Sequence, residues 1–177
     1  MILKTNEITI DNMKKTLVII LLTTINLLVK AQELPTIPAN GYSFPLGSKF
    51  TIKLIPIDSS NFDYSIIEFE TFDKTVDTYK HDGLFNKKGN DNTITFYFCL
   101  GTHGNNKAEK EENMKVHLLM KNYTKYMLNY TSEIQRKENG EYESTSNVGT
   151  YSGAMGNEMW PYMIHSIGLR EFRKMKD

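Results

Sequence analysis

The chain has 177 residues, with 21 Lys and Arg against 21 Asp and Glu, one Cys and one Trp. A chain of this length is expected to form one domain. The balanced charge argues against nucleic acid or an anionic membrane as a partner, because proteins that bind either one carry a basic excess. A single Cys excludes a disulfide within the chain and a zinc site of the Cys-x-x-Cys type.

The N-terminus has the layout of a secretory signal peptide. Lys14 and Lys15 precede an uncharged and nearly continuous apolar run over residues 16–29. Ala31 then provides a small residue at a cleavage position. An uncleaved membrane anchor is the less favoured alternative, because a membrane span needs ~20 predominantly apolar residues and this run is shorter.

This signal divides the chain into two parts. We expect residues 1–31 to be an N-terminal extension and signal peptide, with Met13 as the expected start of translation. Residues 32–177 are expected to form a single exported β-sandwich domain. We expect a periplasmic or secreted protein without a stable transmembrane span after cleavage. The exported part holds all the aromatic residues of the chain, and it is long enough to bury a core of its own.

Most of the exported part alternates apolar and polar residues with the period of a β-strand. Residues 34–45 contain three prolines and are expected to form an extended lead-in. A short helix is predicted over residues 72–83, with a loop as a nearly equal alternative. Strands are predicted over residues 49–57, 64–72, 93–100, 114–121, 126–134 and 160–172.

The predicted strands greatly outnumber the helices and do not alternate with them, as they would in a parallel sheet. We therefore predict an all-β fold, namely an antiparallel β-sandwich of immunoglobulin-like type with at most one or two short helices beside the signal helix. The strands over residues 114–121 and 126–134 are expected to pair as a hairpin, because a short polar connection joins them.

Cys99, His103 and His117 are the residues that would suit an enzyme. Cys99 lies four residues before His103, and His117 lies on a strand expected nearby, an arrangement that would suit a thiol nucleophile with its base. A structural role is favoured, because Cys99 points away from the Phe face of its strand and a free Cys commonly packs as a small apolar residue. The histidines lack the spacing of a metal pair. We predict no catalytic residue, no metal ligand and no cofactor.

The segment over residues 138–158 holds four glycines among Ser, Thr and Asn. A long irregular segment of this kind is often a functional loop. It leads into a cluster of Met and aromatic residues, which are favoured at protein interfaces and suit the stacking of sugars. The predicted binding residues are Tyr151, Met159, Trp160 and Tyr162. In the alternative interpretation, Trp160 packs in the core.

These observations predict a non-catalytic binding or interaction module of the cell envelope, whose partner is an unknown protein or glycan. One alternative is a small cysteine-dependent hydrolase that uses Cys99 with His103 or His117. A second alternative is a structural component of an envelope complex. The sequence does not predict the oligomeric state.

Overall fold

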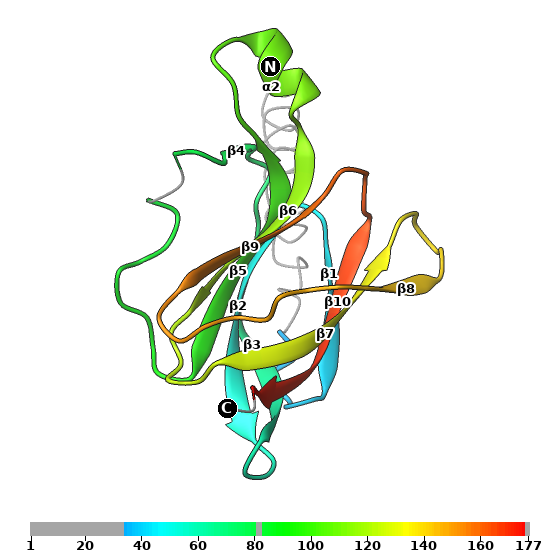
Figure 1. The fold of residues 1–177 in the computed structure, drawn as a ribbon. Coiled ribbons are helices and arrows are strands. Elements are labelled where there is room, and N and C mark those ends of the chain that lie inside the picture. The colour runs from blue at the N-terminus through cyan, green and yellow to red at the C-terminus, as the bar shows by residue number, and fades with distance from the viewer. Residues whose placement is uncertain (1–33, 81–82, 176–177) are drawn as a thin grey trace, which may run out of the picture. The chain divides into compact units, whose positions relative to one another are not determined.

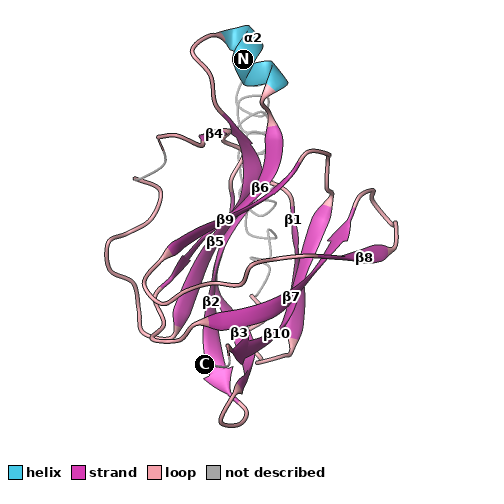
Figure 2. Ribbon diagram, in the orientation of Figure 1, coloured by secondary structure: helices cyan, strands magenta, loops and turns pink. Residues whose placement is uncertain are grey.

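The computed structural model describes residues 34–80 and 83–175. The predicted signal peptide, in residues 1–31, lies outside these ranges. Ten strands of the described part join in one sheet, and one short helix accompanies them (Figure 2). The strands are β1 (Gly41–Pro45), β2 (Ser48–Pro56), β3 (Asn61–Thr71), β4 (Val76–Asp77), β5 (Thr93–Thr102), β6 (Lys115–Asn122), β7 (Leu128–Gln135), β8 (Tyr142–Thr145), β9 (Met155–Trp160) and β10 (Ser166–Lys174). The helix is α2 (Lys107–Glu112).

The order of strands across the sheet is β8-β7-β10-β3-β2-β5-β6-β9, with β1 beside β10 and β4 beside β5. Only the short β4–β5 pairing is parallel among the strands described. The β3–β10 ladder has two residue pairs, and a β-bulge interrupts β10 between Arg170 and Arg173. Bulges bend and twist a sheet, and here the sheet curls into a half-barrel (Figure 1). The predicted antiparallel all-β fold is confirmed, and its immunoglobulin-like form stays a prediction.

Aromatic rings fill much of the core enclosed by this curl. Phe44 of β1 stacks on Phe50 of β2, with 3.5 Å between ring centroids. Tyr64 of β3 is fully buried, and its hydroxyl donates a hydrogen bond to the Leu169 carbonyl at 2.5 Å and accepts one from the Tyr42 amide at 2.8 Å. These bonds satisfy a polar group that would be costly to bury alone. They also connect β3 to β10, through Leu169, and to β1, through Tyr42.

A second, smaller core lies on the other face of β5 and β6. Val76 and Phe85 pack there against Cys99 and Leu119. The helix predicted over residues 72–83 is wrong in the described part of that segment, where Val76 and Asp77 form β4. A short isolated helix is marginal, and the segment instead gains a strand pairing and buries apolar side chains against the sheet.

The predicted hairpin of residues 114–121 and 126–134 is also wrong. The corresponding strand β6 pairs with β5 and β9, whereas β7 pairs with β10 and β8. Asn122 and Thr124 do form a tight turn, in which the Thr124 amide donates to the Asn122 side-chain oxygen at 2.8 Å. The connection nevertheless crosses from one part of the sheet to another, because each strand has an apolar face that several partners could cover.

Candidate functional site

Trp160 packs in the core. Its side chain is 5% exposed and belongs to the main cluster of buried residues. The indole Nε1 of Trp160, on β9, donates a hydrogen bond to Thr145 Oγ1, on β8, at 3.0 Å. Since β8 and β9 are the two ends of the strand order, this bond connects the sheet edges through side chains. Trp160 is therefore not part of an exposed surface.

The other three predicted binding residues are exposed but lie on different segments. Tyr151 lies in the connection between β8 and β9, Met159 lies on β9, and Tyr162 follows β9; their exposed fractions are 52%, 51% and 37%. The guanidinium of Arg136 lies 4.1 Å from the centroid of the Tyr162 ring, so a cation already occupies one face of that ring. Of the four predicted residues, three are thus exposed, and Trp160 is buried.

The glycine-rich segment is also more ordered than its sequence indicates. Its two ends belong to β8 and β9. Between them, Thr150 and Leu128 exchange two backbone hydrogen bonds of 2.8 Å. Gly149 has a φ of 71°, and a Cβ atom at this position would lie 2.5 Å from the Leu128 carbonyl oxygen. Only glycine fits this close approach. Gly149 therefore lets the backbone of this segment pack directly against the backbone of β7.

Cys99 and His117 are directly opposite each other on β5 and β6. Cys99 is buried, and burial raises the pKa of its thiol to about 12. An activated cysteine needs a shift in the opposite direction, since the thiolate is the nucleophile. His117 Nδ1 lies 2.9 Å from the Asn157 side-chain oxygen, and the ring of His103 stacks on Tyr79 with 4.5 Å between centroids.

We expect iodoacetamide to alkylate Cys99 slowly in the folded protein at neutral pH. The raised pKa lowers the thiolate population about a thousandfold relative to an unperturbed thiol, and burial limits access further. Mass spectrometry would follow the labelling rate with and without urea, and the unfolded chain is its own control because it has one Cys. Rapid alkylation of the folded protein would contradict this expectation and favour the hydrolase alternative.

A hollow of about 510 Å³ lies over the face of β1, β10, β7 and β8 that is turned away from the core. The strand register explains its shape. One row across these strands consists of Ser43, Gly168, Glu133 and Ser144. The neighbouring row places Gly41 beside Arg170. Gly41, Gly168 and Ser43 form the low floor of the hollow, because glycine has no side chain and serine has a short one. Sites for small ligands typically have cavity volumes of ~300–1,000 Å³.

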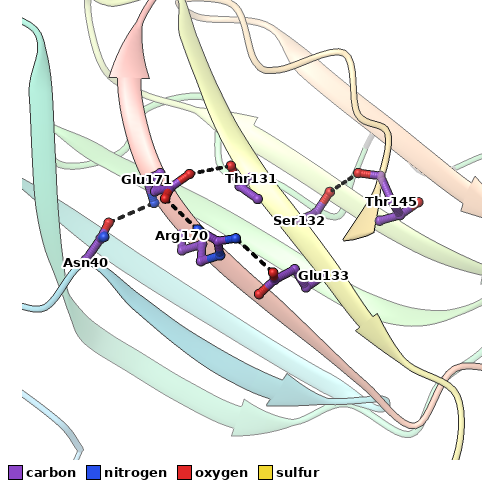
Figure 3. A network of polar contacts seen from close by, with 7 residues as sticks. All are labelled: Asn40, Thr131, Ser132, Glu133, Thr145, Arg170 and Glu171. Atoms are coloured by element: carbon purple, nitrogen blue, oxygen red, sulfur yellow. Dashed lines mark hydrogen bonds and ion pairs between the residues drawn. The ribbon is translucent and has the colours of Figure 1, made fainter. Parts of the chain in front are cut away.

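Arg170 lines the hollow. Its guanidinium lies between the carboxylates of Glu133 and Glu171 (Figure 3). Its guanidinium donates to Glu133 at 2.8 Å and to Glu171 at 2.5 Å. The hydrogen bond from Arg170 lowers the pKa of Glu133 and raises the pKa of the guanidinium. One cation between two carboxylates gives the network a net charge of −1 at neutral pH.

Glu171 holds this network in place through an unusual backbone. Its φ is 58°, in the left-handed region that residues other than glycine seldom adopt. Its amide donates to the backbone oxygen of Asn40 at 3.1 Å and to the side-chain oxygen of Asn40 at 3.0 Å. Its carboxylate also accepts a bond from Thr131 at 2.8 Å. Strained residues held by several bonds, like β-bulges, concentrate near functional sites.

Tyr142 of β8 also lines the hollow. Its hydroxyl lies 2.8 Å from Ser166 Oγ, and Ser166 donates in turn to the Gln135 side-chain oxygen at 2.8 Å. This chain fixes the ring, which is 43% exposed. A Cβ atom at Gly168 would lie 3.7 Å from Tyr142 Cε1, which is an ordinary contact distance, so the ring lies close to the glycine.

The sequence carried one usable signal for the hollow. Gly168 stands at an outward-facing position of the last strand, between the buried Ile167 and Leu169. An isolated glycine within a strand often marks a position that a ligand or another backbone approaches closely. The partners of Gly168 across the sheet come from distant parts of the chain and could not be identified from this signal.

Glu158 is a buried acid that does not line the hollow. Its side chain points inward from β9 and accepts a hydrogen bond from the Tyr130 hydroxyl of β7. Its second carboxyl oxygen has no hydrogen-bond partner within residues 34–80 and 83–175. Burial raises the pKa of Glu158 to about 7, and burial together with the Glu158 charge raises the pKa of Tyr130 well above its ordinary value. This pair therefore couples the stability of the fold to pH.

Comparisons with models of protein families, with curated proteins and with solved structures find no match for this chain. In the described part of the chain, no helix has both the length and the apolar character needed to cross a membrane. No three His, Cys, Asp or Glu side chains of that part are grouped as metal ligands.

Proposed function

We propose that residues 32–177 form a non-catalytic binding module of the cell envelope. A signal peptide in residues 1–31 directs it to the periplasm or the medium, and an immunoglobulin-like β-sandwich is its scaffold. The observation that carries the proposal is the hollow beside Tyr142 and Arg170, which combines a backbone floor, an exposed ring and fixed charges. Such a concave surface with a few oriented polar groups is typical of a binding site.

The hydrolase alternative has less support from the geometry. Cys99 lies in the second core on β5, whereas the hollow lies over β1, β10, β7 and β8. Burial and a raised thiol pKa oppose the nucleophilic role of Cys99. In the hollow, the Glu133 carboxylate is already bound to Arg170.

A role as a structural component of an envelope complex is favoured by one observation. Strand β9 is a sheet edge, and Met155 and Met159 on this strand are 47% and 51% exposed. Exposed methionines are common at adaptable protein contacts. This second candidate uses a different surface from the hollow, so the two roles can be tested separately.

The binding role predicts that filling the hollow abolishes binding to the envelope. Gly168→Leu would place a side chain over the floor, and the space at Gly168 accepts a Cβ atom at ordinary contact distances. We expect the purified variant to sediment with an envelope fraction of the source cells at least about tenfold more weakly than the wild type, while its cooperative thermal unfolding shows that it is folded.

The matched control is Lys107→Leu, which adds the same side chain on α2, where the lysine is 91% exposed. This variant should bind as the wild type does. Equal binding by Gly168→Leu and the wild type, or no saturable binding by the wild type, would overturn the proposed function.

A further inference from the structure

We propose that the hollow binds a neutral, hydroxyl-rich saccharide, with one sugar ring packed on Tyr142 and its hydroxyls bound by the polar groups around Arg170. This inference rests on the proposed binding function and specifies the class of ligand. Three independent features of the hollow support it: the fixed aromatic ring, the mixture of hydrogen-bond donors and acceptors, and the sign of the net charge.

The ring of Tyr142 provides the apolar contact. Its hydroxyl is held by Ser166, so the ring is already ordered before a ligand arrives. An ordered ring loses little conformational entropy on binding, which favours affinity. A sugar ring exposes a face of C–H groups, and this face matches an exposed aromatic side chain that combines apolar area with a polar end.

The polar groups around the floor suit hydroxyls in particular. Asn40 and Ser43 are exposed at the hollow, and Glu133 and Arg170 are partly exposed. Arg170 only donates hydrogen bonds, the Glu133 carboxylate only accepts them, and the Asn40 amide and Ser43 hydroxyl can do both. A sugar hydroxyl also donates and accepts, so neighbouring hydroxyls can use both kinds of group. Bonds to the charged groups are the stronger ones.

The net charge separates this ligand class from charged ones. With one guanidinium between Glu133 and Glu171, the network repels an anionic ligand. A cationic group would be attracted to the carboxylates but repelled by Arg170, and its N–H groups could not accept the hydrogen bonds that Arg170 donates. A neutral polyhydroxyl ligand meets neither repulsion.

The test uses the full protein and the envelope fraction of the source cells, treated in three ways before binding. Periodate cleaves vicinal diols, protease removes proteins, and acetylation neutralises amines. We expect periodate to abolish the binding that depends on Gly168, while the other two treatments leave it in place. Binding that survives periodate but is lost after protease or acetylation would overturn the saccharide inference.

Variants of the ring provide a second measurement. Tyr142→Ala should weaken binding about tenfold or more, because the packing surface is removed. Tyr142→Phe should recover most of that loss, since it keeps the ring and removes only the hydroxyl. Equal binding by Tyr142→Ala and the wild type would overturn the inference.

These outcomes distinguish the two proposals. If Gly168→Leu loses binding but periodate has no effect, the binding function stands and the saccharide inference fails. If Gly168→Leu binds as the wild type does, the hollow is not a binding site and both proposals fail.

Discussion

Replacing Glu158 by glutamine is expected to raise the free energy of unfolding by roughly 3 kcal/mol at about pH 8. The carboxyl of Glu158 has a pKa of about 7 in the folded chain, against 4.5 as its ordinary value, because it is buried. Folding therefore favours the protonated acid. Glutamine has a similar shape and can accept the hydrogen bond from Tyr130, but it never carries the buried charge.

The sign of the pH dependence follows from the same two pKa values. Between 4.5 and about 7 the unfolded chain releases this proton while the folded chain keeps it. The contribution of Glu158 to stability is thus fully present below pH 4.5, declines as the pH rises through this window, and is lost above the folded pKa. The stability gain of Glu158→Gln should grow over the same window.

Urea denaturation at a series of pH values would measure this effect. Glu112→Gln is a suitable control, because Glu112 is an exposed carboxylate on α2 and its replacement removes the same charge. The control should follow the wild-type pH profile. Parallel profiles for Glu158→Gln and the wild type would contradict the assignment of the buried proton to Glu158.

Replacing Trp160 by alanine is expected to destabilise the fold by roughly 3–5 kcal/mol. The side chain is 5% exposed, and its removal leaves a cavity in the main core. The loss also breaks the bond from the indole to Thr145, which connects β9 with β8. Thr145→Val removes only the acceptor of this bond, and its expected cost is about 1 kcal/mol.

Urea denaturation would measure both variants, and binding to the envelope fraction would be measured under conditions in which each is folded. Trp160→Ala should then bind as the wild type does, because the indole lies away from the solvent. A Trp160→Ala variant that keeps its stability but loses binding would show instead that the indole contacts a ligand.

The sequence supported the fold class because β-strands have a local signature. Ile94, Phe96 and Phe98 alternate with polar or less apolar residues, and the strand they predict is β5. The predicted strands over residues 49–57 and 64–72 correspond to β2 and β3, within a few residues. A strand can be found in this way because its two faces meet different surroundings at every second residue.

Strand pairing and side-chain burial could not be predicted from the sequence as well as the strands themselves. The short polar connection between the strands over residues 114–121 and 126–134 was recognised, but the two strands pair with other partners. Tyr151, Trp160 and Tyr162 look alike in the sequence, and only the packing shows that the indole is buried. A Met and aromatic cluster satisfies a core and a surface equally well, so composition alone does not separate the two.

The hollow is a feature that the local pattern of amino acids does not predict. The order of amino acids was enough to locate most strands and to interpret Cys99 as a buried apolar residue. It could not place Gly168 beside Ser43 and Glu133, because these three residues lie on strands far apart in the chain and meet only through the register of the sheet. Only the tertiary structure shows this site, because residues of different strands become neighbours only when the strands pair in a fixed register.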